Sequence, residues 1–175
     1  MEQRAKSALE ALARVPLPVA VIASAHGVER GCSTGTLSYL SLDPPLLVIA
    51  LGPGSATLSL VRRSSEFSVS VLSEEQGDVA VRAARKGREQ DKFAEIGIPA
   101  ATPPDGLVAP AVEGSVAVMW CRLVHEGAHG DHVLCVGRIV ASEAAADLAP
   151  LLRFGRRYHR LGVPLDVHGE RHEPL

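Results

Sequence analysis

The chain has 175 residues, a formal net charge of −2 and a composition that is 46% hydrophobic but only 3% aromatic. This length and apolar content allow a core to be buried without disulfides or a structural metal. The small net charge and the scarcity of aromatic residues argue against nucleic acid or an anionic membrane as the partner.

The N-terminal third of the chain predicts one short helix followed by strands. Apolar residues recur on one face over residues 4–14, which favours an amphipathic helix. Residues 19–23 are apolar and partly β-branched, and the His26-Gly27 turn after them indicates a hairpin. A segment rich in Ser, Thr and Gly follows and stops at Asp43-Pro44-Pro45. The continuous apolar run 46–51 is then expected to be a buried strand.

The middle of the chain predicts two helices around a strand. A helix is expected over residues 55–63, capped by the serine at its start. Residues 67–71 alternate between apolar and polar side chains, as a half-buried strand does. Ser73 and Gln76 have the spacing of a capping box, so a second helix is expected from there to about Arg88.

The C-terminal part predicts an irregular segment and a hairpin. Proline and glycine recur over residues 97–114, whereas 116–124 and 133–140 are apolar strands joined by a polar connection. A short basic segment follows from Pro150. Six or so strands with two or three helices do not alternate regularly. The expected fold class is therefore mainly β, an antiparallel barrel with peripheral helices.

The chain as a whole is expected to form one domain over residues 1–175. Its parts would be the helix of residues 4–14, a core over 15–162 and a C-terminal tail over 163–175. The three cysteines are an odd number without CxxC spacing; Cys121 and Cys135 lie in apolar, strand-like runs, which indicates reduced core thiols, and nothing marks Cys32 as a nucleophile rather than a packed thiol. No uncharged run reaches the ~18 residues of a membrane span. A cytoplasmic protein is therefore expected.

One candidate ligand site lies where the strand of residues 46–51 gives way to a helix. A helix start offers unpaired backbone N–H groups and the positive end of the helix dipole. Ser55 and Thr57 add two hydroxyl donors, so this site could hold a phosphate without a lysine. No Gly-Lys-Ser/Thr follows, which excludes a Walker P-loop. A plain helix cap explains the same residues.

A second candidate is the hydroxyl-rich run Ser33-Thr34-Gly35-Thr36. Polar donors on a strand edge, with a glycine that lets the backbone approach a ligand, would suit an oxygen-rich planar cofactor. From the residues alone, an ordinary edge strand facing solvent is the simpler interpretation.

Three histidines, His125, His129 and His132, raise the question of a metal site. Their spacings would align them on a helix, but Gly127 and Gly130 indicate a turn between strands. Exposed turn histidines are therefore expected, and no metal site is predicted. The chain also lacks the Gly-x-Ser-x-Gly motif of serine hydrolases and the Gly-x-Gly-x-x-Gly fingerprint of dinucleotide-binding folds.

Several motifs occur in a fixed order along the chain. The most specific is Ser41-Leu42-Asp43-Pro44-Pro45 with an apolar strand directly behind it. The others are Ser55-x-Thr57, Phe67-x-Val69-x-Val71-Leu72, Asp91-Lys92-Phe93, Gly130-Asp131-His132 and a closing Pro150-Leu151-Leu152 with Tyr158 and Leu161. This ordered set resembles the flavin reductase-like family of FMN-binding split barrels. The match covers residues 15–162, nearly the whole chain.

The resemblance implies a six-stranded antiparallel Greek-key split barrel that forms a homodimer, with flavin near the subunit interface. Nine residues would then contact FMN or FAD: Ser33, Thr34, Gly35, Thr36, Ser55, Thr57, Lys92, Phe93 and Tyr158. Ser55 and Thr57 would hold the phosphate, and Lys92 and Phe93 would close over the flavin. His132, the candidate catalytic residue, would lie on the side of the nicotinamide of NADH or NADPH and orient it, because hydride transfer is the cofactors' own chemistry.

The chain departs from the family's pattern near the expected flavin ring. Gly35 replaces a residue whose side chain usually donates to the flavin, Leu37 replaces an aromatic residue, and Tyr39 replaces a small serine. Trp120 stands where a glutamate is expected before Cys121.

Three hypotheses about function follow from the motifs and the departures. The leading one is an NAD(P)H-dependent flavin reductase that transfers hydride to FMN or FAD and supplies reduced flavin to a partner flavin-dependent monooxygenase. The second is a non-catalytic flavin- or haem-binding module that acts as an electron carrier or sensor. The third is a dimeric barrel that has lost its cofactor.

Overall fold

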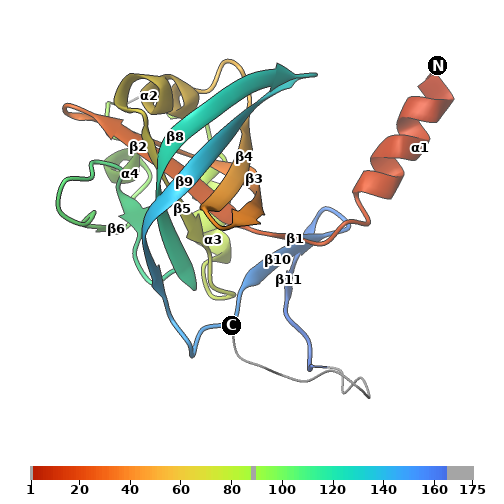
Figure 1. Ribbon diagram of the computed structural model, residues 1–175. Coiled ribbons are helices and arrows are strands. Elements are labelled where there is room, and N and C mark those ends of the chain that lie inside the picture. The colour runs from red at the N-terminus through yellow and green to blue at the C-terminus, as the bar shows by residue number, and fades with distance from the viewer. Residues whose placement is uncertain (1, 88–89, 165–175) are drawn as a thin grey trace.

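In a computed structural model that describes residues 2–87 and 90–164, six strands close into a barrel (Figure 1). They are β2 (Ala20–His26), β3 (Glu29–Leu42), β4 (Pro45–Leu51), β5 (Glu66–Val71), β8 (Ala117–His129) and β9 (His132–Ala144). Their order around the barrel is β2-β3-β4-β9-β8-β5, and all neighbouring pairs are antiparallel. Because β5 returns beside β2, the run β5-β2-β3-β4 has Greek-key order. The predicted six-stranded antiparallel Greek-key barrel is confirmed.

The remaining elements lie outside the barrel. The helices are α1 (Glu2–Leu12), α2 (Ala56–Ser64), α3 (Gly77–Ala83) and α4 (Lys92–Glu95). The short strands are β1 (Leu17–Pro18), β10 (Leu151–Phe154) and β11 (Arg157–Arg160), which form one sheet, and β6 (Ala100–Ala101) and β7 (Ala111–Val112), which pair with each other. Figure 1 shows α1 projecting away from the barrel on the side of β10 and β11. The tail expected over residues 163–175 lies outside the described residues from residue 165 on.

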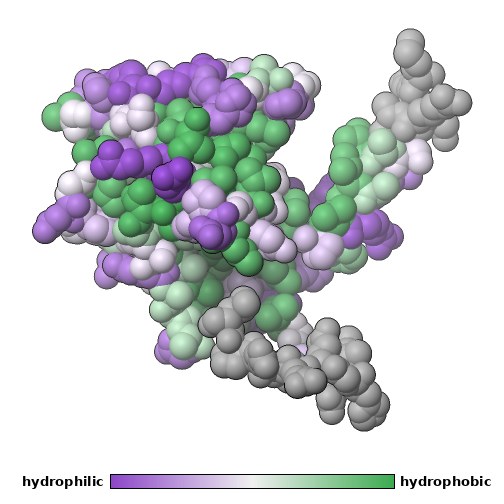
Figure 2. All heavy atoms as spheres, in the orientation of Figure 1, coloured by the Kyte–Doolittle hydropathy of each residue, from purple (hydrophilic) through white to green (hydrophobic). Residues whose placement is uncertain are grey.

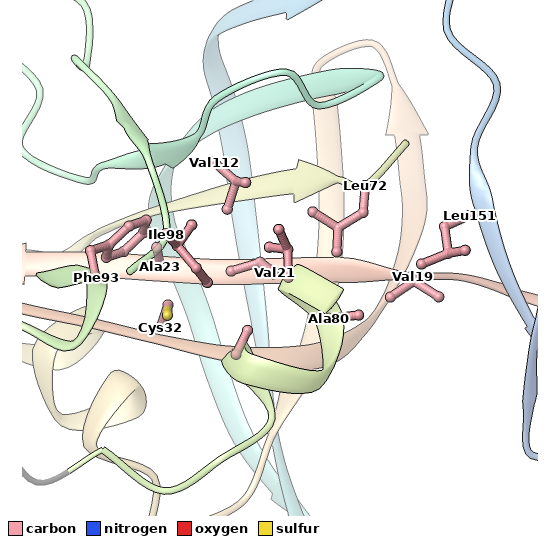
Figure 3. Packing of buried hydrophobic residues seen from close by; sticks show 12 residues of the cluster. Val19, Val21, Ala23, Cys32, Leu72, Ala80, Phe93, Ile98, Val112 and Leu151 are labelled. Carbon is pink, nitrogen blue, oxygen red and sulfur yellow. The ribbon is translucent and has the colours of Figure 1, made fainter. Parts of the chain in front are cut away.

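Three apolar clusters hold the fold together: one inside the barrel, one outside it, and a small third one formed by Ala109, Ala111, Val118 and Trp120. The inner cluster takes alternate residues of β2, β4, β5 and β9, together with Cys121 of β8 and with Leu58 and Val61 of α2. The outer cluster lies between β2, β3 and the helices α3 and α4, and Figure 3 shows Phe93 and Cys32 among its members. Strands β2 and β5 are therefore buried on both faces.

The prediction that residues 67–71 are half-buried is wrong, because the segment 97–114 covers the outer face of β5. Ser68 Oγ donates to the backbone oxygen of Pro110, and Ser70 Oγ accepts from Val112 N at 3.0 Å. Each serine that faces outward is thus paired. Trp120 on the neighbouring β8 is held to the same segment, since its Nε1 donates to Ala109 O at 2.9 Å.

The helices lie where they were predicted, but their first and last residues differ from the predicted ones. The N-terminal helix begins and ends two residues before the predicted 4–14. Ser55 stands at the predicted N-cap position of α2. The capping-box helix is shorter than predicted: Ser73 pairs with Pro150 in an isolated bridge, so it is extended and α3 begins only at Gly77. This helix ends at Ala83, and Arg88, its predicted end, lies outside the described residues.

Strands β4, β8 and β9 also differ from the predictions. Residues Leu47, Ile49 and Leu51 of β4 are buried, but the residues between them are only half-buried and leave an apolar outer face. The long hairpin extends to a two-residue turn at Gly130-Asp131, so most of the predicted polar connection is strand. No helix among the described residues is long and apolar enough to cross a membrane.

Candidate functional site

A cavity of about 700 Å³ opens between β3, the start of α2 and the segment that follows α3. This volume lies within the usual range of small-molecule sites. The cavity is lined by five of the predicted cofactor-contacting residues: Ser33, Thr34, Ser55, Thr57 and Lys92. Barrel closure brings them together from three separate parts of the chain.

Five hydroxyl side chains line the cavity, and none of them has a hydrogen-bond partner among the described residues: Ser33, Thr34, Ser55, Thr57 and Ser59. Ser55 stands at the N-cap of α2, yet its side chain makes no capping hydrogen bond. Thr57 is only 2% exposed, and no hydrogen bond to its hydroxyl occurs within the described part of the chain. Ser33 Oγ is buried and unpaired as well. A buried hydroxyl without a partner costs free energy, so Ser33 Oγ, together with the hydroxyls of the half-buried Ser55 and of Thr57, fits an oxygen-rich ligand in the cavity.

Gly35 and Thr36 follow on β3 but do not line the cavity. A Cβ atom at Gly35 would lie 2.4 Å from Ile22 Cδ1 and 3.2 Å from Ala50 O. Gly35 therefore faces the packed barrel interior, where a side chain would force Ile22 to shift. Thr36 is exposed and pairs with Ala50 of β4.

Lys92 and Phe93 are consecutive residues and both are buried, but their side chains have different surroundings. Lys92 Nζ donates to Cys32 O at 2.5 Å and to Ala83 O at 2.8 Å. Burial lowers the pKa of Lys92, and these two carbonyl oxygens compensate part of the lost hydration. The Phe93 ring is 1% exposed within the outer apolar cluster (Figure 3) and does not line the cavity.

An ion pair joins the start of β3 to α4 behind the cavity. Arg30 Nε donates to Asp91 Oδ2 at 2.9 Å, and Asp91 Oδ1 accepts from Ala94 N at 3.2 Å. Burial acts to raise the pKa of Asp91, but the Arg30 guanidinium and the backbone N–H groups outweigh it and hold that pKa below its usual range. The Arg30 guanidinium also lies over the Phe93 ring, 6.0 Å from its centroid. The Asp-Lys-Phe motif thus connects α4 to β3.

Sequence reasoning missed three basic residues of the cavity. Arg30, Arg85 and Lys86 all line it. The sequence signal that could have indicated them is the pair Arg85-Lys86 shortly before the Asp91-Lys92-Phe93 motif. Periodicity had placed this pair near the end of the predicted helix.

The structure does not bring His132 and Tyr158 to this cavity. His132 lies at the tip of the β8–β9 hairpin, half-exposed, with its Nδ1 hydrogen-bonded to Asp131 Oδ1 at 2.8 Å. That hydrogen bond lowers the pKa of Asp131. Tyr158 lies on β11, where the Arg153 guanidinium is 5.9 Å from its ring centroid. In the described part of the chain, no group of three His, Cys, Asp or Glu side chains could hold a metal ion.

The three cysteines are free and buried, as expected. Burial raises the pKa of Cys32 to about 11, that of Cys121 to about 12 and that of Cys135 to about 11. The thiols stay protonated at neutral pH and are poor nucleophiles. Cys32 therefore lines the cavity as an apolar side chain.

Three relatives resemble most of the chain. One from Streptomyces coelicolor, named actinorhodin polyketide dimerase, is 32% identical and covers 87% of this chain and 84% of its own. The reductase component of 4-hydroxyphenylacetate 3-monooxygenase from Thermus thermophilus is 34% identical, and the match covers 89% of this chain and 95% of that relative. An NADH:riboflavin 5′-phosphate oxidoreductase from Streptomyces pristinaespiralis is 33% identical, and the match covers 86% of this chain and 84% of that relative.

A solved structure and a family match agree with these relatives. The structure of the NADH:FAD oxidoreductase SgcE6 from Streptomyces globisporus, in complex with NAD and FAD fragments, superposes with a TM-score of 0.84. It is 23% identical, covers 95% of this chain and 98% of its own, and shows the same fold. Residues 12–162 match the family described as "Flavin reductase like domain". The chain belongs to this flavin reductase-like family.

Proposed function

We propose that the chain is an NAD(P)H-dependent flavin reductase, which passes hydride from a nicotinamide to FMN or FAD. The observation that carries the proposal is the cavity in which the hydroxyls of Ser33, Ser55 and Thr57 have no partner among the residues that the structure describes. Two relatives at 33–34% identity are named as a flavin oxidoreductase and as a monooxygenase reductase component. Hydride transfer is the chemistry of the two bound cofactors, so the protein has to bind and orient them.

In this proposal different residues of the cavity contact different parts of the flavin. Ser33 and Thr34 of β3 contact the ribityl chain and ring, whereas Ser55 and Thr57 hold the phosphate at the start of α2. Lys92 supports this arrangement by holding the Cys32 carbonyl, one residue before Ser33. His132 remains the candidate for orienting the nicotinamide, because its Nε2 has no partner among the described residues.

The proposed homodimer is supported by an apolar surface on the barrel. Leu40 and Leu42 at the end of β3 are exposed, by 54% and 79%, next to the half-buried outer face of β4. Figure 2 shows apolar residues gathered on the barrel face where β4 and β9 lie in Figure 1. Exposed apolar patches of this kind mark contact surfaces, and a twofold dimer would cover the patch on both copies.

The proposed partner is a flavin-dependent monooxygenase that takes up the reduced flavin, in the manner that the name of the Thermus thermophilus relative states for that protein. The transfer passes through the diffusible flavin, so no extended contact between the two proteins is needed.

Steady-state oxidation of NADH and of NADPH, with FMN, FAD and no flavin, tests the proposed function. We expect flavin-dependent, saturable oxidation with at least one pair of substrates. Failure with every pair would reject the reductase, and flavin retained without turnover would identify a non-catalytic flavin-binding module.

A further inference from the structure

Two histidine rings converge near the end of the long β8–β9 hairpin. His125, Gly127 and His129 occupy alternate positions of β8, so all three face the same side of the strand. A Cβ atom at Gly127 would lie 3.8 Å from His125 Nε2 and 3.3 Å from His129 Nε2. Both ring nitrogens thus approach one point, in the space that a side chain at position 127 would fill.

Both rings are free to bind a ligand. His125 and His129 are exposed, and neither forms a hydrogen bond or an ion pair within the part of the chain that the structure describes. In Figure 1 the tip of this hairpin extends beyond the other barrel strands. Neutral imidazole is the commonest metal ligand among side chains, and it suits zinc and copper. Two converging imidazole nitrogens can therefore chelate one such ion.

The neighbouring side chains of the hairpin do not oppose a cation at this point. Directly across on β9, the partners of the two histidines and the glycine are Val136, His132 and Leu134. Partners that stand opposite each other share a face of the sheet, so no lysine or arginine lies beside the pair on this part of the hairpin. Arg62 lies on the opposite face, where its Nε donates to Glu126 Oε1 at 3.0 Å.

The pair supplies two protein ligands rather than a closed set. His132 faces His129 across the turn, but its Nδ1 is hydrogen-bonded to Asp131, and the described residues contain no group of three side chains that could hold an ion. Two imidazole nitrogens on one zinc ion lie about 3–4 Å apart, a separation that rotation of the exposed rings can reach. Water then fills the remaining coordination positions, as it does in open zinc sites. Such an ion exchanges readily with the solvent.

From this geometry we infer that His125 and His129 form a chelating site for a divalent transition-metal ion, Zn²⁺ or Cu²⁺. The site is separate from the flavin cavity, whose lining contains neither histidine, and it does not depend on the proposed function. The spacing of four residues suits a helix face, yet on this strand the intervening glycine lets the two rings meet. Affinity for nitrogen ligands is higher for Cu²⁺ than for Zn²⁺, and Mg²⁺ prefers oxygen ligands, so the expected order is copper, zinc and no magnesium.

Isothermal titration of the untagged full chain with zinc chloride tests this site. His125→Gln and His129→Gln each remove one ligand, and each should weaken Zn²⁺ binding at least about tenfold, because even groups behind the ligands contribute that much. Gly127→Val keeps both histidines but fills the space between their rings, so it should weaken binding as well, and valine suits a strand. In wild type alone, electron paramagnetic resonance with one equivalent of Cu²⁺ should show coupling to the nitrogens of two imidazoles.

The chain has seven histidines, so two control variants separate this pair from the others. His26→Gln removes an exposed histidine at the end of β2, and His168→Gln with His172→Gln removes two histidines that lie outside the described residues. Both controls should bind Zn²⁺ as wild type does. The assignment is overturned if wild type binds no Zn²⁺, if a control loses the binding instead, or if either single histidine variant or the glycine variant keeps full affinity. The copper spectrum needs only wild type, so coupling to fewer than two imidazoles would overturn it even where a variant failed to fold.

Discussion

Lys92 Nζ donates a hydrogen bond of 2.5 Å to the backbone oxygen of Cys32, sixty residues earlier in the chain. The same ammonium donates to Ala83 O at 2.8 Å. One buried cation therefore joins the strand that carries Ser33 to the end of the helix that precedes Arg85. The two walls of the cavity are connected through this side chain.

Lys92→Met should destabilise the fold and weaken flavin binding together. Methionine keeps the apolar stem but leaves two backbone oxygens unpaired, which costs about 3 kcal/mol of unfolding free energy. Denaturant unfolding measures the loss, and Lys6→Met on the exposed helix α1 is the control. A change below about 0.5 kcal/mol would show that the two hydrogen bonds do not support the cavity.

Replacing Ser55 by Ala and Thr57 by Val should weaken flavin binding and leave the fold intact. Neither hydroxyl has a partner in the described protein, so the variant breaks no internal hydrogen bond. Each lost donor should reduce the binding free energy by about 1 kcal/mol. Fluorescence titration checks the affinity, with Ser7→Ala on α1 as the control. Unchanged affinity would place the phosphate elsewhere.

Replacing His132 by Ala should raise the Michaelis constant for the nicotinamide more than it changes flavin affinity. The ring lies at the hairpin tip, outside the cavity that we assign to the flavin. Initial rates at varied NADH, together with a separate flavin titration, distinguish the two effects. His125→Ala on the same hairpin is the control. An effect confined to flavin affinity would refute the assignment of His132 to the nicotinamide.

Replacing Gly35 by Ala should destabilise the barrel without creating a flavin contact. The added Cβ would meet Ile22 Cδ1 at 2.4 Å inside the packed core. Overpacking of this kind costs about 1–3 kcal/mol. Thermal unfolding measures it, and Gly77→Ala, where a Cβ meets nothing within 4 Å, should change stability far less. Wild-type stability for Gly35→Ala would mean that the barrel wall yields at this point.

The Arg30–Asp91 pair should make stability depend on acid pH. The folded-state pKa of Asp91 is lowered, so its contribution is complete above the unfolded value of about 3.9 and is lost as the pH falls through the folded-state value. Asn can still cap α4, so Asp91→Asn removes the ion pair selectively. Wild type should be the more stable at neutral pH, and the difference should shrink below about pH 4.

Urea unfolding of both proteins across this pH range measures the difference. Asp147→Asn, which removes an exposed carboxylate without an ion pair among the described residues, serves as the control. A gap between wild type and Asp91→Asn that is the same at acid and neutral pH would assign the effect to something other than titration of Asp91.

Local patterns were sufficient for the parts of the fold that depend on neighbours in sequence. Two successive prolines fix φ and remove two N–H donors, which ends strand β3, and the Asp43–Pro44 peptide lies in the tight turn between β3 and β4. Gly-Pro-Gly followed by Ser55 predicts a helix start, because each residue constrains its own backbone or the next few N–H groups. The six-strand barrel then follows from strand periodicity and the ordered motifs.

The composition of the cavity could not be predicted in this way, because it depends on contacts across long stretches of chain. Alternation along β3 sends the Ser33 side chain to the cavity wall, but only closure of the barrel against Ile22 decides that Gly35 has no room for a side chain. The burial of β5 likewise depends on where the segment 97–114 folds back.

The sequence by itself determined the turns, the helix start at Ser55 and an antiparallel arrangement of strands, since these follow from backbone restraints and local periodicity, and the resemblance of the ordered motifs added the six-stranded Greek-key barrel. Tertiary structure alone decided which of the motif residues meet. The Asp-Lys-Phe motif was predicted to close over the flavin, yet Phe93 is buried in the outer cluster and Lys92 ties α3 to β3, while Arg85 and Lys86 line the cavity. The reason is physical: an ammonium at position 92 is compensated by carbonyls at positions 32 and 83, and no local pattern encodes that partnership.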